Sequence, residues 1–158
     1  MQTASAPREV LLVRQVFETW WIGIPPSFEE TFVQEGSYCH AWDHPRSVSL
    51  TSTTVRDGDG PVKADAILAA MPPPPAPRVD RLPDGLTGWG AFIDTEEGAR
   101  APRAITGILA VDGRVLLATI TADDLEWARG IWLTIRHREA PRPSRRAQTW
   151  NRAPGRPG

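Results

Sequence analysis

The feature that most constrains the fold is an Asp-Gly pair between two runs of apolar and β-branched residues. Residues 104–111 and 114–121 are rich in Ile, Leu, Val, Ala and Thr, and only Asp112 and Gly113 separate them. This dipeptide tolerates the positive φ angles that a tight turn between antiparallel strands requires. The pattern predicts a β-hairpin, and its near-continuous apolarity predicts two central strands that are covered on both faces.

Further strand-like segments fill the first third of the chain. They are rich in β-branched and aromatic residues and are separated by turn residues. In the last of them, Val48 and Leu50 alternate with Ser and Thr, which is typical of a strand with one face in water. A later segment, 89–94, has the same character. The early segments predict an antiparallel meander and comprise residues 10–13, 19–24, 31–35, 37–42 and 47–55.

Two segments have a helical pattern. Residues 62–71 open after Pro61 and predict a short helix. Residues 123–136 begin with acidic and end with basic residues, which matches the helix dipole at both ends, although Gly130 costs this helix roughly 1 kcal/mol relative to alanine. The apolar side of the second helix would consist of Leu125, Ala128, Trp132 and Ile135.

The expected fold class is therefore α+β. An antiparallel sheet of about six strands would combine with a short middle helix and a closing C-terminal helix in a sandwich-like arrangement. The 158 residues fit one domain of ordinary size.

Proline marks the boundaries of the domain. Nine of the 16 prolines cluster at 72–77 and in the last 19 residues, where the missing N–H groups and the fixed φ disfavour regular elements. Residues 72–90 are predicted to form a long surface or binding loop. The chain then divides into a flexible N-terminus at 1–8, a single α+β domain at 9–139 and a disordered Arg/Pro-rich tail at 140–158.

Charge is distributed unevenly along the chain. Residues 1–139 hold all 19 acidic residues against 13 lysines and arginines, a net charge of −6, whereas the tail holds five arginines and no acid. Such a tail can bind nucleic acid, an acidic partner or its own domain, and Arg145 and Arg146 are its candidate contacts. The acidic domain disfavours nucleic acid as the partner.

Other features bear on compartment and cofactor. The sequence has no run of 18 apolar residues, so no membrane span is expected, and its one cysteine cannot form an internal disulfide. The expected compartment is the cytoplasm. Neither a phosphate-binding glycine motif nor a nucleophile elbow occurs, and no cofactor is expected.

The order of the expected elements resembles the small α/β/α sandwich of Mog1/PsbP-like proteins. Residues 19–26, which end in two prolines, resemble the early strand of that fold, and residues 104–136 resemble its last hairpin and closing helix. The resemblance covers most of residues 9–138. It implies an adaptor, a chaperone or a binding subunit rather than an enzyme.

One cluster of reactive side chains suggests a different chemistry. Cys39, His40 and His44 are residue types that zinc binds, and a cysteine near a histidine can also serve as a nucleophile. In a strand, however, Cys39 and His40 point to opposite faces, so one metal ion could not easily take all three. The alternative left open is a small enzyme or metal-binding protein centred on these residues.

Tryptophan gives the leading interpretation, because it is enriched among the anchor residues of protein interfaces. Trp20 and Trp21 are adjacent in an expected strand, so they face opposite sides. The sequence predicts a non-enzymatic protein-binding domain with an unidentified partner, and it leaves open both association between copies of the chain and contact with nucleic acid through the tail. The candidate binding tryptophans are Trp20, Trp21, Trp89, Trp127 and Trp150.

Overall fold

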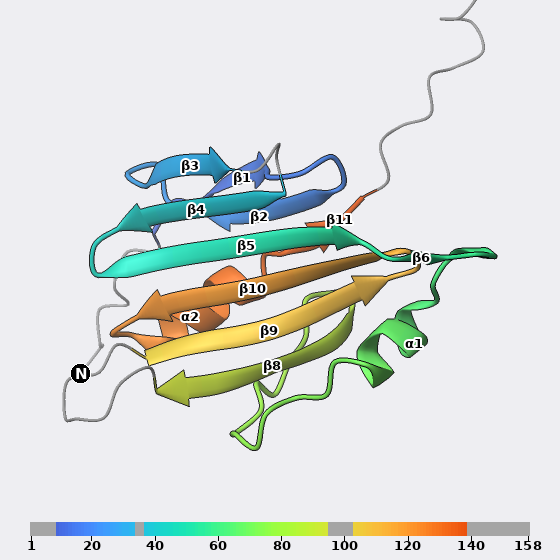
Figure 1. Cartoon of the computed structure of the whole chain (residues 1–158). Helices are drawn as coiled ribbons and strands as arrows, with labels where there is room; N and C mark the ends of the chain where they lie inside the picture. Colours follow the sequence, from blue (N-terminus) through green and yellow to red (C-terminus); the bar gives the residue numbers. More distant parts are fainter. Residues whose placement is uncertain (1–8, 34–36, 95–102, 139–158) are drawn as a thin grey trace, which may run out of the picture.

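The computed structural model describes residues 9–33, 37–94 and 103–138 (Figure 1). Its main feature is a six-stranded antiparallel sheet, as the sequence predicts, with the β9–β10 hairpin near its middle. In spatial order its strands are β3 (Glu29–Val33), β4 (Tyr38–Asp43), β5 (Arg46–Thr54), β10 (Arg114–Ala122), β9 (Arg103–Val111) and β8 (Thr87–Asp94).

A second layer covers one face of this sheet. It consists of a small antiparallel sheet, β1 (Leu12–Gln15), β2 (Trp20–Ile24) and β11 (Arg136–His137), and of helix α2 (Leu125–Trp132). Figure 1 shows β1 and β2 behind β3 to β5, and α2 behind β9 and β10. Helix α1 (Ala64–Ala69) packs on the opposite face of the large sheet, against β9 and β10. The sandwich-like α+β prediction is confirmed.

The meander prediction is right for β3, β4 and β5 and wrong for the first two strands. β1 and β2 pair with each other in the small sheet, not with β3. The chain turns at Pro25, whose carbonyl accepts a hydrogen bond from Phe28 N–H at 3.1 Å, and this turn separates β2 from β3. β2 instead buries Trp20, Ile22 and Ile24 against the large sheet.

The second predicted helix is too long by four residues at its C-terminal end. α2 stops at Trp132, and Thr134 then bridges two elements, because its hydroxyl donates to Ile131 O at 2.6 Å and accepts from Gly23 N–H at 2.8 Å. Arg136 therefore lies in β11, opposite Trp21 of β2. A short hairpin of two two-residue strands, β6 (Arg56–Asp57) and β7 (Gly60–Pro61), forms at the Asp-Gly-Asp-Gly sequence of residues 57–60.

The Asp-Gly turn between β9 and β10 also holds the first turn of α1. Asp112 accepts hydrogen bonds from Ala64 N–H at 3.0 Å and from Lys63 Nζ at 3.1 Å, and these lower the pKa of its carboxyl group. α1 has no side-chain cap from its own N-cap residue. The predicted helix over 62–71 thus forms only over 64–69, where the hairpin supports it.

The segment between α1 and β8 packs along the edge of the sheet. Val79 N–H donates to Gly90 O, and Phe92 N–H donates to Pro77 O, each at 2.8 Å. Val79 and Pro83 are buried. The predicted 72–90 loop is therefore shorter than expected, because β8 begins at Thr87, and it covers the edge of β8.

Trp132 fixes the distance between α2 and the large sheet. Its fully buried indole lies over Gly90 and Gly107, which are paired across β8 and β9. A β-carbon on Gly107 would lie 2.3 Å from a ring atom of Trp132, and one on Gly90 would lie 3.0 Å from the same ring. The indole N–H donates to Arg81 O at 3.1 Å, so the ring also ties down the segment before β8.

Replacing Gly107 with alanine should reduce the free energy of unfolding by about 1–3 kcal/mol, because the new methyl group must displace the Trp132 ring or the β8 backbone. Urea denaturation measures the change. Gly130→Ala is the matched control: Gly130 lies in α2 with no atom within 4 Å of a built β-carbon, so this change should stabilise the protein by up to about 1 kcal/mol. Equal effects of the two substitutions would contradict the close packing at Gly107.

Candidate binding surfaces

The outer face of the large sheet, away from α2, carries no charged residue over four strands. Side chains alternate between the two faces of a strand, and buried Cys39, Ala41, Val48 and Leu50 point toward the second layer. Among the described residues, the outward positions of β4, β5, β10 and β9 contain no Asp, Glu, Lys or Arg. We call the part of this surface not covered by α1 the uncharged face. It consists of Tyr38, His40, Trp42, Ser47, Ser49, Thr51, Thr53, Thr106, Leu117, Thr119 and Thr121.

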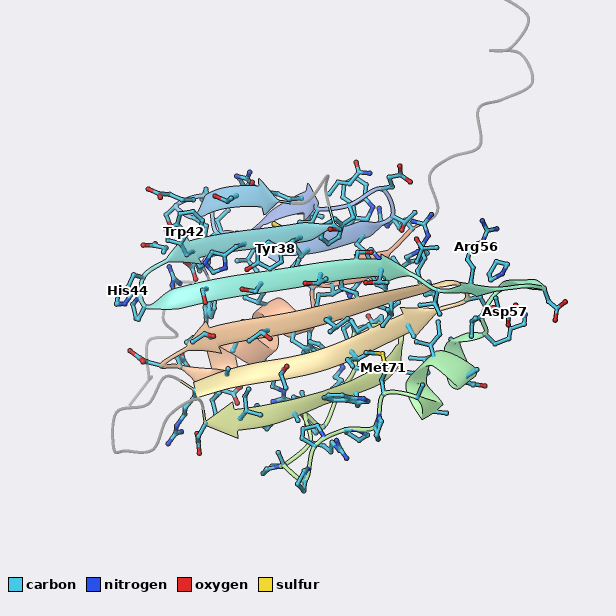
Figure 2. The ribbon with its side chains drawn as sticks, in the orientation of Figure 1. Tyr38, Trp42, His44, Arg56, Asp57 and Met71 are labelled. Carbon is cyan, nitrogen blue, oxygen red and sulfur yellow. The ribbon has the colours of Figure 1, made fainter. Side chains whose placement is uncertain are left out.

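Aromatic rings form one side of the uncharged face. Tyr38, His40 and Trp42 follow one another at alternate positions of β4, and all three are half-buried. Figure 2 shows Tyr38 and Trp42 along this strand. The rings of His40 and Trp42 stack with their centroids 5.1 Å apart and their planes at 20°. His40 Nδ1 lies 2.8 Å from Ser49 Oγ on the next strand. The β4 aromatics are therefore held in place and remain accessible from one side.

Hydroxyl groups and one exposed leucine fill the centre of the same face. The outward residues of β5 are all Ser or Thr, and Thr119 of β10 lies 3.4 Å from Thr106 of β9, measured between the hydroxyl oxygens. Leu117 on β10 is 37% exposed, although it lies in a central strand. This surface offers rigid aromatic, apolar and hydroxyl groups with no charge to desolvate.

The predicted binding tryptophans do not come together. Trp20 is fully buried and packs edge-on against His137, so it offers no surface, whereas Trp21 is half-buried between β1 and β11. Trp89 lies beside α1 and donates its N–H to Met71 O at 2.9 Å. Trp127 lies on α2, on the other side of the molecule from the uncharged face. Trp150, Arg145 and Arg146 lie outside the described residues.

Trp42 and Tyr38 are surface residues that are not among the sequence-predicted binding residues. The sequence predicts a strand over 37–42, and its candidates for metal binding or catalysis there are Cys39, His40 and His44. A pattern in the sequence could have identified them: the small residues Cys39 and Ala41 alternate with three ring-bearing residues along this strand, which puts the three rings on one face.

The residues considered for metal binding or catalysis point in different directions. Cys39 is buried toward the second layer, His40 lies on the uncharged face, and His44 is exposed in the turn between β4 and β5. In the described parts of the chain, no three His, Cys, Asp or Glu side chains are grouped to hold a metal ion. Burial, with Glu30 as a second cause, raises the pKa of the Cys39 thiol to about 11. This thiol is thus in its un-ionised form at neutral pH.

Comparisons with known proteins bear on the fold. No family model matches the sequence, and no curated protein matches it. A solution structure of cyanobacterial PsbP (CyanoP) from Synechocystis sp. PCC 6803 has a TM-score of 0.53 at 9% sequence identity, covering 87% of this chain and 97% of that one. The chain has a PsbP-like fold. This confirms the resemblance noted in the sequence at the level of fold alone.

A second similar structure is larger. A crystal structure of a protein from Bacteroides thetaiotaomicron has a TM-score of 0.51 at 11% identity and covers 76% of this chain. The match spans only 45% of the Bacteroides protein, less than half of its length.

Neither helix that the structure describes is long and apolar enough to cross a membrane.

Cys39 should react slowly with iodoacetamide in the folded protein. With a pKa of about 11, roughly one thiol in a thousand is ionised near pH 8, and the side chain is 1% exposed. Alkylation, followed by intact-mass spectrometry, should be at least about 100-fold slower than in concentrated urea, where burial is lost. Because Cys39 is the only cysteine, the mass shift reports on one site. Equal rates in the folded and unfolded protein would restore Cys39 as a candidate nucleophile.

Proposed function

We propose that the protein is a non-enzymatic protein-binding domain that engages its partner through the uncharged face. The observation that carries this proposal is the absence of charge across four adjacent strands, on a surface that the described helices and strands leave uncovered. α1 covers only the end of the face near Ile108, Ala110 and Val115. Leu117 and the β4 aromatics remain accessible beyond it.

The composition of the uncharged face matches the centre of a protein interface. Interface cores are depleted in charged residues and enriched in Tyr and Trp, which contribute large contact areas at a small cost in conformational entropy. Tyr38 and Trp42 supply these rings, and their strand pairing limits their freedom before binding. The Ser and Thr hydroxyls of β5 and β10 can donate and accept hydrogen bonds at once. They suit a partner surface of backbone amides and uncharged polar side chains.

The other functions considered have less support. The three side chains of the metal or catalytic alternative diverge, as described above, and Cys39 is un-ionised at neutral pH. Nucleic acid would require a positively charged surface, whereas the uncharged face has no Lys or Arg. The PsbP-like fold is compatible with the proposal, since the resemblance implies adaptors and binding subunits more than enzymes.

The test is a substitution at the centre of the uncharged face. Leu117→Arg introduces a charge that a partner would have to desolvate, so it should weaken partner binding by at least about 10-fold, equivalent to 1.4 kcal/mol. The partner is first captured through a photo-crosslinking amino acid at position 117 and identified by mass spectrometry. Its affinity for the unmodified full chain and for the Leu117→Arg chain is then measured by calorimetry.

Val13→Arg provides the matched control. Val13 is 69% exposed on β1, in the small sheet, so this change adds the same charge to a different surface. It should leave the affinity unchanged, and the melting temperatures of both variants should stay close to that of the parent. The proposal fails if Leu117→Arg binds the partner as tightly as Val13→Arg does, or if position 117 crosslinks to no protein.

A further inference from the structure

A groove of about 600 Å³ lies on the other side of the molecule, between the segment that leads into β1 and the exposed side of α2. Leu11, Trp127 and Ile131 give it an apolar lining, and Glu9 and Glu126 add carboxylates. Gly130 also lines it, with no atom within 4 Å of a built β-carbon. The groove is therefore open above the middle of α2.

Trp127 is held rigidly at the side of this groove. Its indole N–H donates to Glu9 at 2.8 Å, and its ring stacks on Phe28 with centroids 5.8 Å apart. The Arg46 guanidinium lies 4.8 Å from the centroid of Trp127 and 5.2 Å from that of Phe28, and it donates to both carboxylate oxygens of Glu9. A group that binds here meets a preorganised surface, so little entropy is lost in ordering it.

Carboxylates outnumber basic groups around Trp127. A second hollow, of about 210 Å³, lies next to Trp127 near the N-terminus of α2. Asp123 and Asp124, which are both exposed, form part of its lining. Of the residues that the structure describes, the linings of the two hollows contain these two, Glu9 and Glu126, and one basic residue, Arg46. Arg46 is already paired with Glu9. The surroundings of the groove therefore favour a positively charged occupant that also carries an apolar group.

We propose that the occupant is the chain's own C-terminal tail, with Trp150 in the groove and the neighbouring arginines on the carboxylates around it. The tail, residues 140–158, lies outside the described residues and has the complementary chemistry: five arginines, no acid and one tryptophan. Arg145 and Arg146 precede Trp150, and Arg152 follows it, so both ends of the groove can be reached. Residues 1–139 carry a net charge of −6, which adds a long-range attraction.

The tail is long enough to reach the groove. Arg138 N–H donates a hydrogen bond to Thr19 O at the far end of the small sheet. From Arg138, Glu9 lies two strands across this sheet and about eight residue positions along the strand direction. At the usual strand spacings this separation is about 30 Å. The eleven residues 139–149 span up to about 36 Å when extended. A short connection of this kind gives the tail an effective concentration on the order of 1 mM at the groove, so a weak contact suffices to fill it.

Two-dimensional NMR of the isotope-labelled full chain tests the proposal. Trp150→Ala should shift the amide signals of Glu9, Trp127 and Gly130 and leave those of β4 and β5 in place. Gly130→Arg, which puts a like charge into the groove, should release the tail and move the Glu9 and Trp127 signals in the same direction. In about 1 M salt, where the screening length is about 3 Å, the signals of the parent chain should approach those of Trp150→Ala.

Gln148→Ala is the matched control, because it changes a tail residue that is neither aromatic nor charged, and it should leave the groove signals unchanged. The proposal is overturned if Trp150→Ala moves only signals of the tail, or moves those of the uncharged face in place of the groove. It is also overturned if the groove shifts disappear on dilution from about 1 mM to about 10 µM, because an intramolecular contact does not depend on concentration. That result would assign the docked tail to a second copy of the chain.

Discussion

The packing of Trp132 against two glycines is the contact on which the arrangement of the layers depends. Gly90 and Gly107 are paired across β8 and β9, and because neither has a side chain, the indole ring of Trp132 fits directly over them. The ring belongs to α2, so this contact sets how closely the helix approaches the sheet. Through its N–H it also holds Arg81, and with it the segment that closes the edge of β8. Three parts of the chain that are distant in sequence thus depend on one side chain.

The fold also determines where charge can lie. The second layer buries one face of the large sheet, and the ion pairs of this layer occur at its margins, as in Arg14 with Glu30 and Arg46 with Glu9. α1 covers one end of the opposite face, where Asp112 of the central hairpin holds its first turn. Over β4, β5, β10 and β9, the described remainder of that face is solvated without charged side chains. A surface that only has to face water could carry Lys and Glu equally well. The uncharged composition of this face therefore favours contact with another protein surface.

Local sequence signals predicted the fold where local contacts decide it. The central hairpin forms at Asp112 and Gly113 because turn chemistry acts over two residues, and Gly113 has the left-handed φ of +79°. The end of α2 was misjudged because it depends on a hydrogen bond between Thr134 and Gly23, 111 residues apart. The uncharged face was missed for the same reason: which strands lie side by side, and so which outward residues form one surface, depends on long-range pairing. Trp20 is buried rather than exposed because β11 and the large sheet cover β2.

The uncharged face and the Trp127 groove lie on opposite sides of the large sheet, which separates their roles. A tail docked beside α2 does not occupy the partner surface on β4, β5 and β10, so it cannot block that surface directly. It would instead neutralise carboxylates at the acidic end of the domain and cover the exposed part of Trp127. α2 packs on β9 and β10 with Ala128, Ile131 and Trp132 buried, so a tail that stabilises α2 would also support the strand that presents Leu117. Coupling between the two surfaces would therefore pass through the buried side chains of α2, of which Trp132 lies over Gly90 and Gly107.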